Sequence, residues 1–405
     1  MSKIRVLAIP SDAHGVGKYR VLDPYRFIGS NYGEEFHVDI VMDVADDDKI
    51  FENYDMVVLH SFIHKSTYER NLERISWLKA KGIKVIVDID DFWLVDQRHP
   101  AYHQIVSSKL PEKKVQLLKA ADYVTTTTPL FAKVIKERLG LKNIHIFPNA
   151  VDDTEPQFQP KPNKSELIRF GWLGGSSHLH DLELMRGNIS SIHNSHKGKV
   201  QFVLCGFDTR GSVTEIDKNT GQKRVRDIKP EETVWKVYED IFTDNYKTLD
   251  PEYIKYLLQY RESDYDDVNQ PYRRRWTKNI STYASNYNNF DVSLTPLVDS
   301  FFNGCKSQLK VIEAGFHKKA VIASETNPYS LDLKSAVSNG EFTDGNALLV
   351  SQNKNHKQWA QHMKRLIDNP NMIEDLGNRL YETVKDKYSL KNVCQDRVQF
   401  LKSIK

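Results

Sequence analysis

The chain alternates short apolar segments with amphipathic ones, and this alternation constrains its fold more than any other feature. The apolar runs are typical of buried strands, and helical patterns such as Thr67–Lys81 and Glu112–Ala121 lie between them. Strands that alternate with helices form parallel, doubly wound α/β sheets. The strands predicted for the first half of the chain are Ile4–Ile9, Val38–Met42, Met56–His60, Ile83–Asp88, Tyr123–Thr126 and Ile144–Phe147.

The alternation starts again after a proline-containing segment, so we predict two domains. Residues 153–165 contain three prolines and no periodicity, which is typical of an interdomain linker. The 405 residues also exceed what one ordinary core accommodates. We expect two Rossmann-like domains that face a cleft, at residues 1–152 and 166–388, and a terminal helix at 389–405. The strands predicted for the second half are Leu167–Leu173, Val200–Cys205, Asp291–Pro296 and Ala320–Ala323.

Residues 206–289 are polar, charged and rich in tyrosine, and we interpret them as an insertion in the second domain. Turn signals after Asp208 predict a loop or a hairpin. We expect a strand at Thr233–Tyr238 and helices at Pro251–Tyr260 and Trp276–Asn288. The run Arg273–Arg275 either begins a solvated helix or faces an anionic acceptor, and the sequence leaves both interpretations open.

Composition limits the class of protein. The chain is 40% hydrophobic and 27% charged, which is typical of globular domains, and no apolar run approaches the ~20 residues of a membrane span. Three widely spaced cysteines predict neither a disulfide framework nor a Cys-x-x-Cys metal site, and they favour a reducing cytoplasm. The net charge of +3 indicates no particular partner, and we expect no nucleic acid.

A loop, a helix and a strand follow one another in residues 301–324. Asn303-Gly304 is a turn signal, and apolar residues at helical spacing predict a helix from about Lys306 to Phe316. Ser307 is a candidate for the N-cap of this helix. The apolar run that follows predicts a buried strand.

The start of this helix has the chemistry of a nucleoside diphosphate site. A helix N-terminus beside the charge of Lys306 suits a phosphate. Glu313 lies two helical turns further along the same face, where its carboxylate can accept hydrogen bonds from a ribose diol. A surface lysine and a glutamate on a solvated helix are the simpler alternative.

Further candidate residues, which are polar side chains and loop glycines, follow the predicted strands at the carboxyl ends where doubly wound sheets bind ligands. Each also has a simpler interpretation, as a tight turn, a partly buried histidine or an aspartate that caps a turn. Because three carboxylates lie close together after Ile83–Asp88, at least one of them should have a cationic neighbour. These candidate residues are Gly15, Gly17, Arg20, His60, Asp88, Asp90, Asp91, Gly174, Gly175, Ser176 and His178.

Several of these motifs, in order, resemble the retaining glycosyltransferases of family 4, which have the two-Rossmann-domain GT-B fold. The segment Lys306-Ser307-x-Leu309-Lys310-x-x-Glu313 resembles the donor-site helix of that family. Phe147-Pro-Asn-Ala-Val-Asp152 resembles the motif that ends its first domain, and Gly15-Val-Gly-Lys-Tyr-Arg20 resembles its first loop. The chain departs from the family at Cys305, where a glutamate often contacts the donor sugar, and at 318–320, where the family has Gly-x-Pro.

The resemblance implies transfer of a sugar from a nucleoside diphosphate-sugar to a hydroxyl acceptor, with retention and without a metal or other cofactor. The acceptor would be a glycan or a lipid-linked sugar in surface polysaccharide synthesis, in the cytoplasm or at the inner face of the membrane, with peripheral membrane contact. An epimerase or hydrolase on the same fold and a non-catalytic sugar- or nucleotide-binding protein are the alternatives.

The resemblance also implies roles for individual residues. Glu313 binds the ribose, and the other donor-binding residues are Gly174, Gly175, Ser176, His178, Asn303, Lys306 and Ser307. Catalysis falls to Asp90, Asp91 and Lys306, which orient the reacting sugar and stabilise the leaving group. The acceptor or phosphate side is formed by Gly15, Gly17, Arg20 and His60.

Overall fold

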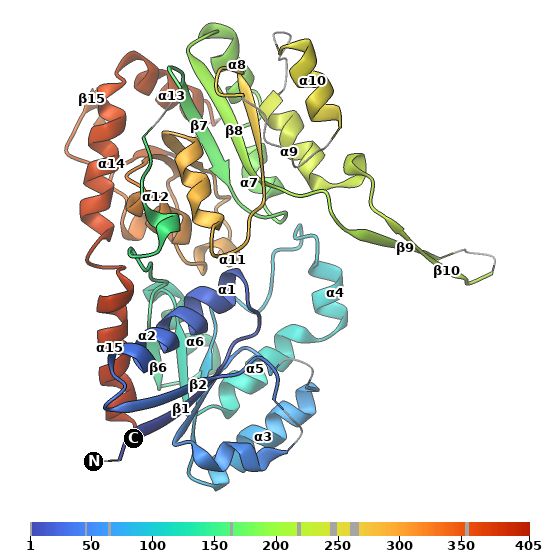
Figure 1. The fold of residues 1–405 in the computed structure, drawn as a ribbon, viewed down its shortest axis with the longest axis vertical. Helices are drawn as coiled ribbons and strands as arrows, with labels where there is room; N and C mark the ends of the chain where they lie inside the picture. The colour runs from blue at the N-terminus through green and yellow to red at the C-terminus, as the bar shows by residue number, and fades with distance from the viewer. Residues whose placement is uncertain are drawn as a thin grey trace.

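The computed structural model describes residues 2–44, 47–63, 66–162, 165–216, 220–243, 249–259, 267–352 and 356–405. They form two parallel six-stranded sheets, one below the other in Figure 1, each covered by helices. The strands of the lower sheet come from the first 146 residues and those of the upper sheet from residues 168–350. Each sheet has its own buried apolar core.

The first sheet has the strand order β2-β1-β3-β4-β5-β6, and every pairing is parallel. The order reverses between β1 and β3, and this switch point opens a crevice at the carboxyl ends of those strands. Its helices include α2 (Asp23–Asn31), α3 (Tyr68–Ala80), α5 (Leu110–Ala120) and α6 (Pro129–Leu139). The strands are β1 (Ile4–Ile9), β2 (Phe36–Ile40), β3 (Met56–His60), β4 (Lys84–Asp88), β5 (Tyr123–Thr126) and β6 (Ile144–Ile146).

The second sheet has the order β11-β8-β7-β12-β13-β16, again with parallel pairings. In sequence rank this is the order 3-2-1-4-5-6 of dinucleotide-binding domains, with its switch point between β7 and β12. The strands are β7 (Ile168–Leu173), β8 (Val200–Phe207), β11 (Tyr272–Trp276), β12 (Val292–Thr295), β13 (Ala320–Ser324) and β16 (Leu348–Val350).

The structure corrects our interpretation of residues 206–289 as an insertion. β11 is the third strand of the sheet, and α9 (Val234–Thr243) packs against β8 as its crossover helix. Residues 233–238 therefore enter a helix rather than a strand, because Trp235, Tyr238 and Phe242 bury one face of it. Trp276–Asn288 is likewise not one helix, since β11 ends at Trp276 and a 3-10 helix covers Tyr283–Asn289.

The three consecutive arginines of β11 form ion pairs inside the second domain. Arg274 is 1% exposed and binds both oxygens of Glu239, at 2.9 Å each, while Arg273 and Arg275 both contact Asp267 at 2.5 Å. Neither a solvated helix start nor an acceptor-facing patch, our two interpretations of this run, agrees with these contacts.

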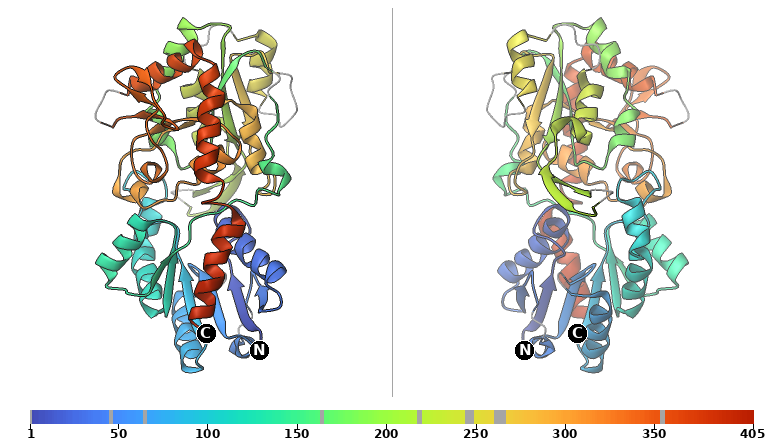
Figure 2. Two further views of the ribbon diagram at one scale, coloured as in Figure 1. Left: turned by 90° about the vertical axis from the view of Figure 1, so that its left-hand side faces the viewer. Right: turned by 90° about the vertical axis from the view of Figure 1, so that its right-hand side faces the viewer.

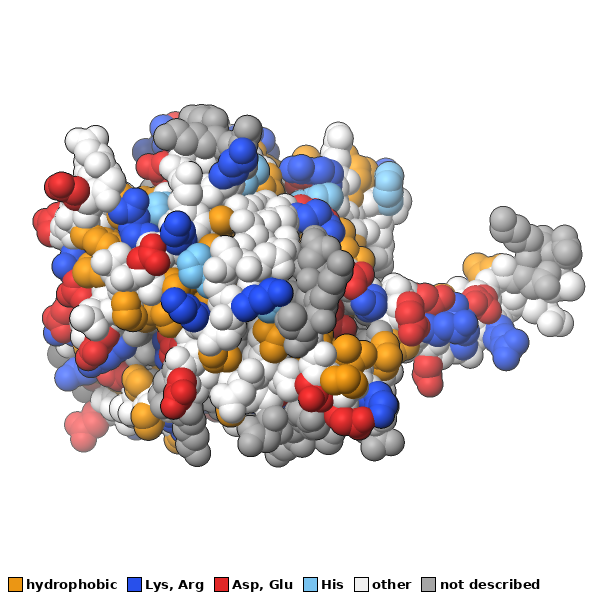
Figure 3. Space-filling model, turned by 90° about the horizontal axis from the view of Figure 1, so that it is seen from above, with side chains coloured by type: hydrophobic (Ala, Val, Ile, Leu, Met, Phe, Trp, Pro, Cys, Tyr) orange, Lys and Arg blue, Asp and Glu red, His pale blue; other side chains and the backbone are white. Residues whose placement is uncertain are grey.

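Within residues 206–289, a hairpin and one helix are additional to a Rossmann-like domain. β9 (Ser212–Ile216) and β10 (Lys223–Asp227) pair antiparallel and project away from the body, with charges of both signs along them (Figure 3). α10 (Pro251–Leu258) packs beside α9 at the edge of the second sheet (Figure 1). Residues 217–219, 244–248 and 260–266 of this segment lie outside the described parts of the chain.

The two domains are connected twice. Residues 153–162 are packed rather than loose: Lys18 bonds Glu155 at 2.5 Å, and Gln157 is 3% exposed and accepts a hydrogen bond from the backbone of Ala284. Residues 163 and 164 of the predicted linker are not described. The chain then returns through α14 (Asn371–Val384) and α15 (Leu390–Ser403), and α15 lies against α2 of the first domain (Figure 2).

Candidate active site

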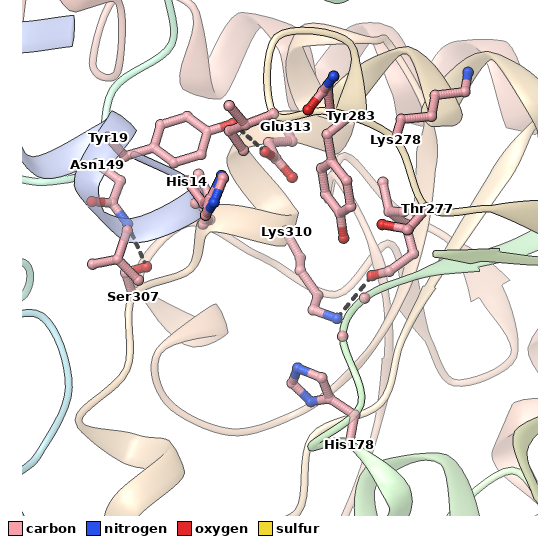
Figure 4. Close-up of a pocket in the computed structure, with 18 of the residues that line it drawn as sticks. His14, Tyr19, Asn149, His178, Thr277, Lys278, Tyr283, Ser307, Lys310 and Glu313 are labelled. Carbon is pink, nitrogen blue, oxygen red and sulfur yellow. Dashed lines mark hydrogen bonds between the residues drawn. The ribbon is translucent and has the colours of Figure 1, made fainter. Parts of the chain in front are cut away.

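A cavity of about 640 Å³ lies between the two sheets, at the carboxyl ends of their strands. Loops from both switch points line it, as the rule for doubly wound sheets predicts. Figure 4 shows side chains from the two domains converging on it. The first domain contributes His14, Gly15, Val16, Tyr19, Asp90 and Asn149, and the second contributes Leu173, Gly174, Gly175, His178, Asp208, Arg210, Thr277, Lys278, Asn279, Ile280, Tyr283, Ser307, Leu309, Lys310 and Glu313.

Lys310 is the central cation on the wall formed by the second domain. Its Nζ donates to the backbone oxygen of Leu173 at 2.9 Å and lies 4.6 Å from the centre of the Trp172 ring. Burial lowers the pKa of Lys310 to about 8, with nearby Asp181 opposing and Lys306 reinforcing the shift. The lysine is therefore largely protonated at neutral pH and is held by uncharged groups.

The glycine loop after β7 leaves room for this lysine. A Cβ atom on Gly174 would lie 2.4 Å from the Trp172 ring and 2.6 Å from the Nζ of Lys310, whereas one on Gly175 would meet nothing within 4 Å. Glycine at 174 is thus required by close packing, and Gly175 exposes backbone to the cavity. Ser176 is exposed but does not line the cavity.

His178, predicted to support the diphosphate, lies beside Lys310 on the cavity wall. Its Nδ1 is 2.7 Å from Asp181 Oδ2. Burial and the charge of Lys310 lower the pKa of His178 to about 4. His178 is therefore a neutral polar group at physiological pH and adds no charge beside a phosphate.

Glu313, the predicted ribose ligand, is 3% exposed and lies at the inner edge of the cavity. Tyr19 of the first domain donates to its Oε1 at 2.5 Å, and Tyr287 of the second domain donates to its Oε2 at 3.1 Å. Burial raises the pKa of Glu313, and the two hydroxyl donors oppose that shift. A carboxylate held by neutral donors keeps acceptor capacity for the hydroxyls of a ligand.

The helix that carries Glu313 begins later than the sequence indicates. α12 covers Leu309–Phe316 with Gln308 at its N-cap, and a separate turn of helix, α11 (Phe301–Gly304), precedes it. Ser307 is therefore not the cap. It lines the cavity, and its Oγ accepts a hydrogen bond from Asn149 Nδ2 of the first domain at 2.8 Å.

Lys306 and Asn303 line a smaller neighbouring pocket of about 40 Å³ rather than the main cavity. The Nζ of Lys306 lies 4.7 Å from the centre of the Phe302 ring. Phe302 and Cys305 are buried in the core of the first domain, so Cys305 presents no group to a donor sugar. α11 thus closes one side of the cleft by packing into the opposite domain.

Asp90 is the acidic residue of the first domain that lines the cavity. Its Oδ1 lies 3.2 Å from the Nε2 of His60, whose Nδ1 is 2.6 Å from the hydroxyl of Ser11. Although burial acts in the opposite direction, His60 lowers the pKa of Asp90 to about 2. Burial and the charge of Asp90 raise the pKa of the adjacent Asp91 to about 6. The two carboxylates are thus poised for different protonation states.

Arg20, predicted for the phosphate or acceptor side, does not line the cavity. It has no exposed surface and binds both oxygens of Asp88, at 2.8 and 2.7 Å, with a further bond to the backbone oxygen of Phe147. The cation expected beside the three aspartates is therefore present, and it neutralises Asp88 at the carboxyl end of β4. Gly17 also lies behind the cavity, where a Cβ would come within 1.8 Å of the Asp12 carbonyl oxygen.

Gly15 lines the cavity as predicted, but it does so from a helix. The segment we interpreted as a loop becomes helical at Gly15–Gly17 (α1) and continues as a π-helix over Lys18–Leu22 into α2. This continuous helix places Tyr19 over Glu313.

The sequence did not single out Tyr19, Asn149, Lys310 or the 277–283 segment as parts of the site. Lys310 had a signal, because it lies three residues before Glu313 and four after Lys306, on the same helical face. Tyr19 had none, since its partner is 294 positions away along the chain.

Within the parts of the chain that the structure describes, no cluster of three or more histidine, cysteine, aspartate or glutamate residues could hold a metal ion. Nor does any helix there have the length and hydropathy needed to cross a membrane.

No protein-family model and no curated protein matches the sequence. Solved structures, however, match over nearly the whole chain. Anabaena HepE in complex with UDP and glucose superposes with a TM-score of 0.61 at 11% identity, covering 99% of this chain and 100% of that one. An alpha-glucosyltransferase in complex with UDP-glucose and DNA gives 0.60 at 11% identity with the same coverage.

A UDP-forming trehalose-phosphate synthase from Burkholderia xenovorans gives a TM-score of 0.53 at 10% identity, covering 94% of this chain and 78% of that one. At such low identity these matches show a shared fold. The chain has the GT-B fold, with two Rossmann-like domains and a cavity at their facing switch points.

Proposed function

We propose that this protein is a glycosyltransferase that moves a sugar from a nucleoside diphosphate-sugar to a hydroxyl acceptor, with retention of configuration. The observation that carries the proposal is the composition of one cavity wall: Lys310, the glycine pair 174–175, the start of α12 and Glu313 lie together on the second domain. A cation, exposed backbone and a carboxylate in this arrangement match a diphosphate followed by a ribose. Fold similarity alone would not carry a function.

In this proposal the second domain holds the donor. Lys310 and the backbone N–H groups at the start of α12 stabilise the negative charge that develops on the departing diphosphate. Glu313 accepts hydrogen bonds from the ribose hydroxyls. The side of the cavity lined by 277–280 and Tyr283 receives the base, and we take UDP as the first nucleotide to test because HepE is bound to it.

The first domain then serves the reacting sugar and the acceptor. Asp90 faces the cavity and accepts a hydrogen bond from a sugar hydroxyl. α1 of the first domain and α11 of the second domain lie on either side of the cavity and limit the access of water to the reacting carbon. We further propose that no metal is required, since Lys310 and the backbone supply the stabilising charge. A glycan or lipid-linked acceptor, and with it a role in surface polysaccharide synthesis, follows from the sequence resemblance.

The experiment is a turnover assay with UDP-glucose and other nucleoside diphosphate-sugars, with and without a panel of glycan and lipid-linked acceptors. Proton NMR of the product reports the anomeric configuration, and Lys310→Met serves as the inactive control. Acceptor-dependent release of nucleotide with a retained anomer is the expected result. Donor consumption without acceptor would indicate a hydrolase or an epimerase, and nucleotide binding without turnover would indicate a non-catalytic binding protein.

A further inference from the structure

Four polar side chains form a continuous chain on the first-domain side of the cavity. They follow the carboxyl ends of three adjacent strands: Asp12 and Ser11 come after β1, His60 ends β3, and Asp90 follows β4. Ser11 Oγ is 2.9 Å from Asp12 Oδ2 and 2.6 Å from His60 Nδ1, and His60 Nε2 is 3.2 Å from Asp90 Oδ1. The chain therefore links the loop before Gly15 to a carboxylate that lines the cavity.

Counting protons along this chain shows which charge state of the histidine lets every contact be a hydrogen bond. An ionised carboxylate only accepts hydrogen bonds, and a hydroxyl has one proton to donate. Asp12 Oδ1 accepts from the backbone N–H of His14 at 2.8 Å and of Gly17 at 3.2 Å, so Asp12 is an acceptor in this loop. With the Ser11 proton in the hydrogen bond to Asp12, His60 donates from Nδ1 to Ser11 and from Nε2 to Asp90. In this arrangement both ring nitrogens carry protons, as they do in an imidazolium.

This arrangement differs from that of a nucleophilic serine. In a Ser-His-Asp triad the histidine accepts the serine proton. Here that proton is committed to Asp12, and the histidine is a donor at both nitrogens. Ser11 is therefore a connecting group, and the chain has a structural task at the edge of the cavity.

The charges around His60 agree with this state. His60 is 3% exposed, and the charged groups that face it are Asp88, Asp90 and Arg20. Asp88 and Arg20 neutralise each other through two hydrogen bonds, which leaves Asp90 as the counter-ion of His60. Although burial lowers the pKa of His60, the hydrogen bond and the charge of Asp90 raise it above its ordinary value.

We propose that His60 is a positively charged positioning residue that keeps Asp90 ionised and aimed into the cavity, so that any proton shared by the aspartate pair resides on Asp91. The role of Asp90 towards a sugar hydroxyl rests on the proposed function. Lys114 and Lys306 also face the pair, Lys306 towards Asp91, and both remain when His60 is replaced.

The test of this role compares His60→Gln with Ser11→Ala in pH profiles of turnover. In His60→Gln, Asp90 loses its counter-ion beside Asp91, so the acid limb of the kcat profile should move up by one pH unit or more. The KM for the donor should change less than twofold, because the opposite wall is untouched. Ser11→Ala should shift the limb in the same direction by a smaller amount, and thermal unfolding of both variants establishes that they are folded.

His37→Gln is the matched control. His37 also pairs with an aspartate in the first domain, with Nε2 at 3.1 Å from Asp39, but both side chains are exposed at 57% and 42%. The acid limb of the kcat profile of His37→Gln should coincide with that of the unsubstituted protein. An unshifted limb in His60→Gln would overturn the positioning role.

The charge state is measured without any substrate. Histidine NMR of 15N-labelled protein, with the His60 signals assigned by their loss in His60→Gln, should show both ring nitrogens protonated at pH 7. In Asp90→Asn the same signals should titrate at lower pH. A neutral His60 at pH 7 overturns the inference whatever the activity. An imidazolium in a protein that turns over no donor instead overturns the proposed function, while leaving the charge state established.

Discussion

Two cations on opposite sides of the cavity are held in different ways. Behind the first-domain wall, Arg20 has both oxygens of Asp88 as partners, at 2.8 and 2.7 Å, and has no exposed surface. On the second-domain wall Lys310 donates to a backbone carbonyl oxygen and lies over the ring of Trp172. A cation paired with a buried carboxylate stabilises the fold, whereas one held by neutral groups keeps its charge for an anion. The difference supports our proposal that the second domain binds the diphosphate.

The largest effect should come from breaking the structural pair. Arg20→Met leaves the charge of Asp88 buried without its partner, which costs about 3–5 kcal/mol in the free energy of unfolding. Urea denaturation measures this loss. Arg5→Met is the control, because Arg5 pairs with Asp55 on the surface at 3.4 Å and such pairs contribute about 0–1 kcal/mol. Equal losses in the two variants would remove the distinction between the walls.

The pair also predicts the acid stability of the protein. Arg20 lowers the pKa of Asp88 against the opposing effect of burial. A carboxylate with a depressed folded-state pKa contributes stability that is present above its unfolded pKa of about 3.9 and is lost as pH falls through the folded value. Arg20→Met should therefore differ most from the unsubstituted protein above pH 4.

Removing the other cation should act on function instead of stability. Lys310→Met deletes the charge that stabilises the departing diphosphate, and turnover should fall about 10²–10³-fold, the range seen when one such group is lost. The free energy of unfolding should change little. Steady-state release of nucleotide measures the loss, and Lys364→Met, on the exposed face of α13 (Gln358–Asp368), is the control. Turnover within threefold of normal in Lys310→Met would remove the lysine from the mechanism.

A methyl group can displace the same cation without deleting it. The Cβ introduced by Gly174→Ala would lie 2.6 Å from the Nζ of Lys310 and against the Trp172 ring, so we expect about a tenfold loss of kcat/KM. Gly175→Ala adds a methyl group to open space and should lose less. The two variants differ by one position, and equal losses would show that Lys310 placement is not the cause.

The smallest effect is a pH dependence of nucleotide binding. As pH rises through the Lys310 pKa of about 8, the lysine loses its charge and UDP affinity should decline, by at most about tenfold per pH unit. Calorimetric titrations between pH 7 and pH 9 follow the decline. In Lys310→Arg the side chain stays charged throughout, and the decline should disappear if this lysine causes it.

Much of this architecture could be predicted from the sequence, because strand and helix periodicities are local. The strands of the first sheet and the order of the glycine loops follow from short patterns. β11 was missed, since Arg273–Arg275 reads as a polar surface until Glu239 and Asp267 are brought to it by folding. A strand whose charged residues form buried ion pairs cannot be predicted by a method that assumes charged residues are exposed.

The site shows the same limit. Glu313 and the glycine pair 174–175 could be singled out from strand and helix signals, and the structure places them on one wall of the cavity. Arg20 was a candidate site residue but is buried against Asp88, whereas Lys310 was not a candidate and lines the cavity. Neither outcome could be predicted, because the partner of each residue is contributed by a distant segment. Asp88 is 68 positions from Arg20, and Leu173 is 137 positions from Lys310.

The measurement that tests the central claim most directly is a calorimetric titration of UDP, GDP and ADP into the protein, beside Glu313→Ala and Lys310→Met. The account predicts that one nucleotide binds with a stoichiometry of one and that each variant weakens it by about 10–100-fold, the loss expected for a hydrogen bond to a charged group. Absence of binding to every nucleotide by the folded protein would contradict the account. Unchanged affinity in both variants would place the nucleotide elsewhere and contradict it equally.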